Sequence, residues 1–338
     1  MTKRLLKKSS ECLVTQQLPP VTHYLSTGCT VLDLAISDRF PGGFGGGRIA
    51  HIYGPESTGK SILALEPLGS SQRQGGNTGF LDAEGTLDFD RAQQLFGVDI
   101  SILNYISAIT GNIDDLTIEY MFSTIIGDAL RNADTEHPSA LSVDSLSAIT
   151  SGKELDDNDP YGASRAKALS AGFRKIIWQL CQKNLALIFI DQTRQNVGAP
   201  AFAKKTTFSG GEALKFYAST RLFVNLQKKL ENTSKKIIGI NVGFTVEKNK
   251  IAPPFRSGTF RVLFDYGIDN IGSNLDWLNE HEFLGNSKGY LTWEGKRYRF
   301  DDLIFHIEDN GLENELDKYI AECWRTVYTK GERKEKIR

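Results

Sequence analysis

A glycine-rich stretch in the first quarter of the chain carries the clearest chemical signal. Residues 54–61 follow the pattern G-x-x-x-x-G-K-[ST], which is typical of a loop that binds nucleotide phosphates. The glycines let the backbone turn tightly, so that successive N–H groups can point at phosphate oxygens. The lysine is then placed to reach the β- and γ-phosphates, and the hydroxyl to bind Mg²⁺. The predicted nucleotide-binding residues are Gly54, Pro55, Glu56, Ser57, Thr58, Gly59, Lys60 and Ser61, of which Ser61 is also a predicted metal ligand.

Two carboxylates and an amide stand at three other places where short apolar runs end. Glu84 is a candidate for orienting and deprotonating the water that attacks the γ-phosphate, with a solvated loop acid as the alternative. Asp144 is a candidate for the Mg²⁺ side of the site, or else a helix cap. Gln192 follows Asp191, where its amide could bond the γ-phosphate and report its presence to the segment that follows.

The order of elements around the glycine-rich stretch supports a phosphate site. The apolar residues 48–53 predict a buried strand, and residues 61–65 predict the first turn of a helix. Strand, loop and helix in this order point a helix N-terminus at an anion. An ordinary glycine-rich turn is the alternative that this context disfavours. Pro67 lies within the expected helix and predicts a kink or an early end, because proline removes an N–H and clashes with the preceding turn.

Apolar runs alternate with helical patterns along most of the chain. Predicted strands are 79–82, 103–106, 140–144 and 185–190, and predicted helices are 88–96, 113–131 and 163–183. This alternation predicts an α/β fold with a mainly parallel sheet covered on both faces, and active residues at the carboxyl ends of the strands. Strands expected at 221–227, 237–247 and 259–264 add an antiparallel extension. Residues 269–328 form a smaller mixed unit rich in Trp and Tyr.

Two long loops follow predicted strands. Residues 193–211 are long for a loop within a compact domain, and they combine basic residues with phenylalanines and glycines. Such a mixture suits the backbone of a single-stranded nucleic acid. Residues 152–163 are acidic, but the helix after them carries Arg165 and Arg174. Solvated surface is the plain alternative for both loops.

Composition is that of an ordinary globular protein. The 338 residues carry a net charge of −1, so the total charge indicates no partner. Four scattered cysteines lack metal or redox spacing, which favours free thiols in a reducing compartment, and five dispersed histidines suggest no zinc site. No apolar run approaches the roughly 18 residues of a membrane span. Residues 1–24 are basic but lack a secretory pattern, so we expect a cytoplasmic protein whose N-terminal segment is a tail or an arm that docks on a neighbouring subunit.

From about residue 26 to residue 327 the chain resembles the bacterial RecA family of homologous-recombination ATPases. The resemblance depends on several separate motifs that occur in the family's order. They are residues 54–61, Asp82-Ala83-Glu84, residues 95–100 (L-F-G-V-D-I), Val143-Asp144-Ser145, residues 188–192, residues 210–219 and residues 248–255. The unit at 269–328 resembles the family's small C-terminal domain. The resemblance therefore implies a RecA-like P-loop NTPase core with a small α+β domain after it.

The resemblance also implies roles for individual residues. It implies a catalytic set of Glu84, Lys60, Gln192, Lys248 and Lys250. Of these, Lys248 and Lys250 would reach the ATP of a neighbouring subunit. It implies ATP and Mg²⁺ as cofactors, with Ser61 and Asp144 on the metal and Asp88 and Arg91 beside the nucleotide. The implied DNA-binding residues are Arg165, Arg174, Arg194, Phe202, Lys204, Lys205, Gly210 and Gly211.

Some positions depart from the bacterial pattern. Arg91 stands where the bacterial family places an aromatic residue, and it is more like the archaeal and eukaryotic recombinases, in which an arginine stacks on the base. Asp191 stands where Asn is more usual. The N-terminal arm is short, and the tail at 329–338 is basic rather than acidic. These departures suggest a phage or mobile-element member of the family.

We therefore predict an ATP-dependent recombinase that forms a helical filament on single-stranded DNA, pairs it with homologous double-stranded DNA and exchanges strands. Single-strand-binding and loader proteins are expected partners. The predicted division is a short arm at 1–24, an ATPase core at 25–268 with DNA loops near 152–163 and 193–211, a C-terminal domain at 269–328 and a tail at 329–338. The alternatives are a filament or mediator ATPase that does not exchange strands, and a P-loop ATPase that acts on protein.

Overall fold

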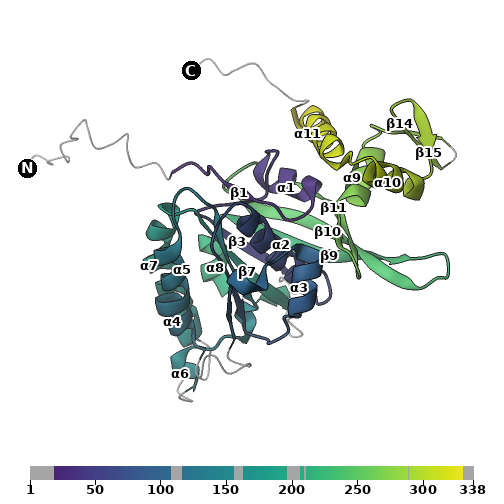
Figure 1. The fold of residues 1–338 in the computed structure, drawn as a ribbon. Coiled ribbons are helices and arrows are strands. Elements are labelled where there is room, and N and C mark those ends of the chain that lie inside the picture. The colour runs from purple at the N-terminus through teal and green to yellow at the C-terminus, as the bar shows by residue number, and fades with distance from the viewer. Residues whose placement is uncertain are drawn as a thin grey trace, which may run out of the picture.

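The computed structural model describes residues 19–107, 116–155, 163–195, 206–208, 211–287 and 289–329, and its main feature is one large twisted sheet (Figure 1). The strand order is β12-β11-β10-β9-β3-β7-β6-β4-β5. The bounds are β3 Ile49–Gly54, β4 Thr78–Asp82, β5 Leu103–Ile106, β6 Ser139–Asp144, β7 Leu185–Gln195, β9 Thr220–Glu231, β10 Ile237–Asn249, β11 Ser257–Leu263 and β12 Gly267–Asp269. The α/β fold class is confirmed.

Strand direction changes within this sheet. β5, β4, β6, β7, β3 and β9 pair in parallel, and β10, β11 and β12 continue in antiparallel pairing. The prediction that the strand at 221–227 belongs to the antiparallel part is therefore wrong at its first pair, because β9 lies parallel to β3. The antiparallel extension begins one strand later, at β10.

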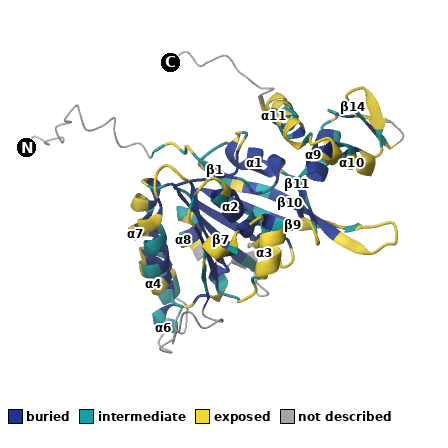
Figure 2. Ribbon diagram, viewed as in Figure 1, coloured by how far each residue is buried: buried dark blue, intermediate teal, exposed yellow. Residues whose placement is uncertain are grey.

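Helices cover both faces of the sheet, and the apolar side chains of β7 alternate between the two faces. Ala186, Ile188 and Ile190 join one core cluster, and Leu185, Leu187 and Phe189 join the other. The first cluster includes α1 Thr30–Ser37, α2 Lys60–Arg73 and α3 Phe89–Phe96, and the second includes α4 Ile118–Tyr120, α5 Ile126–Asn132, α7 Ala163–Cys181 and α8 Gly211–Tyr217. The buried strands between these layers are dark blue in Figure 2.

Helix α2 does not end early. It continues through Pro67 to Arg73, so the predicted early end is wrong. Pro67 has no N–H for the carbonyl of Leu63, four residues before it. The next carbonyl, that of Ala64, accepts a hydrogen bond from Ser142 Oγ on β6 at 2.7 Å. This bond attaches the same turn of α2 to β6, and the burial of the helix against the sheet offsets the local cost of the proline.

Shorter elements complete the core. β1 Tyr24–Leu25 pairs with β2 Phe44–Gly45, and β8 Thr206–Phe208 pairs with β7. A π-helical turn at Met121–Ile125 joins α4 to α5, so the helix predicted at 113–131 is interrupted where it is described. The remaining short helices are η1 Ile100–Ile102, η3 Leu146–Ala148 and α6 Gly152–Leu155. In the described ranges no helix has the length and apolar character needed to span a bilayer.

The C-terminal elements dock on α1. They are α9 Asn270–Glu280, β13 Gly285–Ser287, β14 Tyr290–Trp293, β15 Lys296–Tyr298, α10 Phe300–Asp309 and α11 Glu313–Thr329. Asp317 Oδ1 accepts hydrogen bonds from Thr30 Oγ1 at 2.7 Å and from Asn274 Nδ2 at 2.8 Å. Trp324 Nε1 donates to Asp38 Oδ1 at 3.1 Å. A continuous cluster of buried apolar residues also runs from this unit into the core.

One acidic side chain in α2, that of Glu66, lies in surroundings that disfavour its charged form. Glu66 is turned toward Gly28, where an added Cβ would lie 2.6 Å from the Glu66 Cδ atom. Burial raises the pKa of Glu66 from 4.5 to about 8, although Arg73 opposes this shift. The fold therefore favours the protonated carboxyl group. The contribution of protonated Glu66 to the free energy of unfolding is fully present below pH 4.5. It is lost as the pH rises through about 8.

Replacing Glu66 by Gln is therefore expected to stabilise the protein increasingly as pH rises. The gain in free energy of unfolding should be small near pH 5, should grow to as much as about 5 kcal/mol and should level off above pH 8. Chemical denaturation from pH 5 to pH 9 measures it, with exposed Glu315→Gln as the control. A gain that is independent of pH would contradict the assignment.

Candidate functional site

The phosphate-loop pattern forms a tight turn between β3 and the start of α2. Ser57 and Gly59 have left-handed backbones, with φ of 56° and 76°. Gly54 lies so close to β9 that an added Cβ would be 2.0 Å from the carbonyl oxygen of Val224. Residues 55–57 are exposed, while Thr58 and Lys60 are buried. The loop therefore curls around the N-terminus of a 14-residue helix, the arrangement that binds phosphate.

Lys60 lies among carboxylates. Its Nζ donates a hydrogen bond to the carbonyl oxygen of Pro55 at 2.5 Å. Burial lowers the pKa of Lys60, and Asp144 and Glu84 oppose that shift. Burial raises the pKa of Asp144 to about 6, against a hydrogen bond from Ser61 and with a further contribution from Glu84. Carboxylate and hydroxyl oxygens gathered around one ammonium group fit Mg²⁺, which takes oxygen ligands.

Glu84 and Gln192 meet, although 108 residues separate them in sequence. Glu84 Oε1 accepts a hydrogen bond from Gln192 Nε2 at 3.3 Å and from Ser145 Oγ at 2.5 Å. Glu84 follows β4, Ser145 follows β6 and Gln192 lies in β7. The carboxyl ends of parallel strands meet at one edge of a sheet, which brings these side chains together.

The sequence motifs did not identify how the Glu84 loop is held. Asp82, at the end of β4, is fully buried and accepts hydrogen bonds from the N–H groups of Gly85 at 2.7 Å and Leu87 at 2.8 Å. The hydroxyl of Tyr105 also donates to it, at 3.1 Å. Asp82 thus shapes the loop that carries Glu84. A carboxylate three residues before a glycine was the only signal in the sequence.

Asp88 and Arg91 lie beside the helix that follows the phosphate loop. Asp88 caps α3 by accepting a hydrogen bond from the Arg91 N–H at 3.0 Å, and the Arg91 guanidinium donates to the carbonyl oxygen of Phe264 at 2.8 Å. Both residues line a cavity of about 270 Å³, together with Ser61 and Asp144. The predicted base-side and metal-side residues therefore share one cavity.

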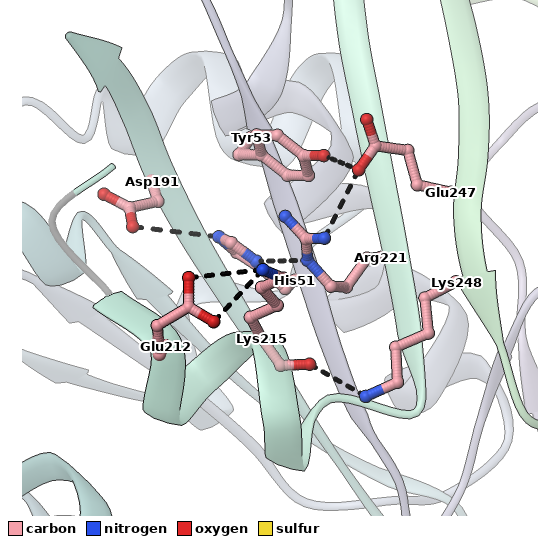
Figure 3. Close-up of polar contacts among 8 residues, drawn as sticks. All are labelled: His51, Tyr53, Asp191, Glu212, Lys215, Arg221, Glu247 and Lys248. Atoms are coloured by element: carbon pink, nitrogen blue, oxygen red, sulfur yellow. Dashed lines mark hydrogen bonds and ion pairs between the residues drawn. The ribbon is translucent and has the colours of Figure 1, made fainter. Parts of the chain in front are cut away.

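The two predicted lysines at the end of β10, Lys248 within the strand and Lys250 directly after it, lie away from this cavity. Lys248 Nζ donates to the carbonyl oxygen of Lys215 at 2.8 Å, at the end of α8 (Figure 3). It also donates to the carbonyl oxygen of Phe216 at 2.7 Å. Burial, together with nearby cations of which Lys250 contributes most, lowers the pKa of Lys248 to about 8. Lys250 lines a cavity of about 580 Å³ with exposed Trp178 and Phe216. As far as the structure describes the chain, neither lysine hydrogen-bonds to the phosphate loop of its own subunit.

The predicted DNA-binding residues are only partly within the described ranges. Arg165 is turned inward, and its guanidinium donates to the carbonyl oxygens of Leu146, at 2.7 Å, and Ile149. Arg174 is exposed on α7, and the backbone of Arg194 pairs with Thr207 of β8. Gly211 begins α8. Phe202, Lys204, Lys205 and Gly210 lie outside the described residues.

Comparison with known proteins agrees with this geometry. The family model described as the RecA N-terminal domain matches residues 3–269. Protein RecA of Leifsonia xyli subsp. xyli is 37% identical over 271 residues, which are 80% of this chain and 71% of the relative. Protein RecA of Rhodococcus jostii is 34% identical over 303 residues (88% and 82%), and that of Trichodesmium erythraeum is 33% identical over 290 residues (85% and 76%). The chain therefore belongs to the RecA family and is a DNA-dependent ATPase of homologous recombination.

Proposed function

We propose that this protein hydrolyses ATP at a site that two neighbouring subunits complete in a helical filament on single-stranded DNA, and that the filament pairs this DNA with a homologous duplex. The observation that carries the proposal is the hydrogen bond between Glu84 and Gln192. It joins the predicted catalytic carboxylate to the strand that leads directly into the predicted DNA loop. ATP chemistry and DNA binding then depend on the same strand.

In the chemical step, Lys60 and the N-terminus of α2 hold the phosphates, and Glu84 accepts a proton from the attacking water. Asp144 and Ser61 would hold Mg²⁺, which neutralises charge that develops on the transferred phosphoryl group. Ser145 and Gln192 orient the Glu84 carboxylate through their hydrogen bonds to Oε1. Burial of Lys60 strengthens its attraction for phosphate, because charges interact more strongly away from water.

In this proposal the Gln192 side chain couples the chemistry to DNA. β7 continues beyond it to Gln195 and pairs with β8, with Thr193 opposite Phe208. Shortly after β8, at Gly211, α8 begins. A shift of Gln192 toward a γ-phosphate would therefore move both ends of the predicted DNA loop at 193–211. ATP would hold this loop in its binding state and hydrolysis would release it.

Lys248 and Lys250 would act on the ATP of the next subunit. Support comes from their position at the far end of α8 from the DNA loop, without a hydrogen bond to their own phosphate loop in the described ranges. A contact between two different faces repeats from subunit to subunit and builds an open helix. Cations supplied in this way tie hydrolysis to assembly. We further propose the predicted domain division, a cytoplasmic location, and single-strand-binding and loader proteins as partners.

Replacing both lysines, Lys248→Ala with Lys250→Ala, is expected to lower DNA-stimulated ATP turnover by about 100-fold or more, because phosphoryl charge loses its stabilising cations. Isolated subunits should still bind ATP with the affinity of the unmodified protein. Turnover assays with and without single-stranded DNA, and equilibrium ATP binding at low protein concentration, measure both effects. Exposed Lys296→Ala with Lys318→Ala is the matched control. Loss of ATP binding by isolated subunits would contradict action in trans.

A strand-exchange assay tests the proposed function as a whole. Circular single-stranded DNA and linear homologous duplex are incubated with the protein, ATP and Mg²⁺. We expect nicked circular products without any second recombinase. Products that form only after a second recombinase is added would contradict the proposal and favour a mediator role.

A further inference from the structure

A row of polar side chains, buried except at its Glu247 end, crosses four neighbouring strands of the sheet (Figure 3). It begins at Asp191 on β7 and continues through His51 on β3 and Arg221 on β9 to Glu247 on β10. His51 and Asp191 are fully buried, and Arg221 is nearly so. In the register His51 lies opposite Arg221, and Asp191 lies opposite Tyr53, two residues further along β3. Glu247 is at an irregularity of β10, next to Lys248, which lies opposite Arg221.

The His51 ring bridges the first half of this row. Arg221 Nε donates to His51 Nδ1 at 3.4 Å, and because a guanidinium group only donates, Nδ1 must be an acceptor. Burial lowers the pKa of His51, which favours the neutral ring. The proton of the neutral ring must then be on Nε2, which lies 3.7 Å from Asp191 Oδ2. His51 therefore accepts from one neighbour and presents its N–H to the other.

Arg221 and Glu247 form the second half of the row. Arg221 Nη1 donates to Glu247 Oε2 at 3.3 Å, and the hydroxyl of Tyr53 donates to the same oxygen. The Arg221 guanidinium also lies over the Tyr53 ring, 4.6 Å from its centroid. Glu247 directly precedes Lys248, and Tyr53 directly precedes Gly54 of the phosphate loop. The row thus ends next to Lys248, whose Nζ hydrogen-bonds to the carboxyl end of α8.

Stability alone does not account for such a row. The part of this row from Asp191 to Arg221 is buried, and buried ionic groups are generally no more stabilising than apolar side chains of similar volume, because their desolvation cost offsets the attraction. The next residue on this face of β3, two positions before His51, is apolar Ile49. The same strand therefore accommodates an apolar residue on the same face, although it has a histidine between Asp191 and Arg221.

We propose that His51 is a positioning residue that keeps the Gln192 end of β7 in register with the Lys248 end of β10. Gln192, which would bind the γ-phosphate of its own subunit, and Lys248, which would reach the ATP of the next subunit, then move together. This inference rests on the roles proposed above for Gln192 and Lys248. It adds a mechanical link within one subunit. The link connects Gln192, at the subunit's own ATP site, with Lys248, at the ATP site of the next subunit.

The test removes the link without leaving a buried charge unpaired. In His51→Leu with Asp191→Asn, we expect a melting temperature near that of the unmodified protein and unchanged ATP binding by isolated subunits. DNA-stimulated turnover should fall by about tenfold, in the range of typical coupling between sites. His51→Gln, whose amide both accepts and donates, should recover most of that loss. Thr220→Val removes a buried hydroxyl with no partner in the described ranges and is the control expected to change nothing.

Two outcomes would overturn the inference without affecting the proposed function. Full DNA-stimulated turnover in the double variant would mean that His51 contributes packing only. If His51→Gln is as impaired as the double variant, the polar contacts of the His51 ring with Arg221 and Asp191 do not carry the effect. Retained DNA stimulation in Lys248→Ala with Lys250→Ala would instead contradict the proposed function, and with it this inference. If the lysine variant behaves as expected while His51→Leu with Asp191→Asn stays fully active, the proposed function stands and only the role proposed for His51 is contradicted.

Discussion

Replacing Lys60 by Ala is expected to abolish nucleotide-dependent assembly on single-stranded DNA. Lys60 is a buried cation that would face the phosphates, and Asp144 and Glu84 lie around it. Its loss removes charge-assisted hydrogen bonds of about 1.5–3 kcal/mol each and leaves the carboxylates to repel the nucleotide. We therefore expect ATP affinity to fall by about 100-fold or more.

Equilibrium ATP binding and sedimentation with single-stranded DNA measure this prediction. The melting temperature without nucleotide should change little, so that a folding defect can be told from a binding defect. The exposed substitution Lys318→Ala serves as the control. Normal ATP-dependent filaments in Lys60→Ala would contradict the assignment of the phosphate site.

Glu84→Gln is expected to separate binding from turnover. The amide oxygen can still accept the hydrogen bonds of Ser145 and Gln192, so the site should keep its shape. It can no longer accept a proton from water, and loss of a positioned base typically costs 10² to 10⁴ in rate, so turnover should fall by about that factor. ATP and DNA binding should persist, and the filaments should be long-lived, because the proposed function makes their release depend on hydrolysis.

Single-turnover hydrolysis and filament lifetime after dilution measure this prediction. Glu136→Gln, an exposed carboxylate far from the carboxyl ends of the strands, is the matched control. Turnover equal to that of the unmodified protein would mean that another group accepts the proton. Short-lived filaments with slow turnover would mean that release does not depend on hydrolysis.

The candidate site was predictable where local patterns have fixed geometric consequences. The G-x-x-x-x-G-K-[ST] spacing determines the turn at Gly54 and the start of α2 at Lys60. Glu84 and Gln192 could be placed together because polar residues after parallel strands meet at one edge. The fold class followed from apolar runs that alternate with helical patterns. In each case the sequence signal is contained in a short segment.

Features that depend on contacts between distant segments were not predictable. Pro67 does not end α2, because burial against the sheet outweighs the local cost. Arg165 turns inward onto carbonyl oxygens, although a basic residue after a loop looks exposed in the sequence. The row through His51 depends on the lateral register of four strands, and no sequence motif encodes that register. The position of Asp82 at the end of a strand was predictable, but nothing in the sequence indicated that it holds the Glu84 loop.

The central claim is that each ATP site is completed by the next subunit. Mixing two variants tests it most directly: Glu84→Gln keeps its lysines but cannot hydrolyse ATP, and Lys248→Ala with Lys250→Ala keeps Glu84 but offers no lysines. Each should be nearly inactive alone with single-stranded DNA. In an equal mixture, about a quarter of random head-to-tail interfaces would combine both intact halves, so turnover should recover to about a quarter of the unmodified rate. A mixture with only the sum of the two separate activities would contradict the claim and place the lysines at their own subunit's site.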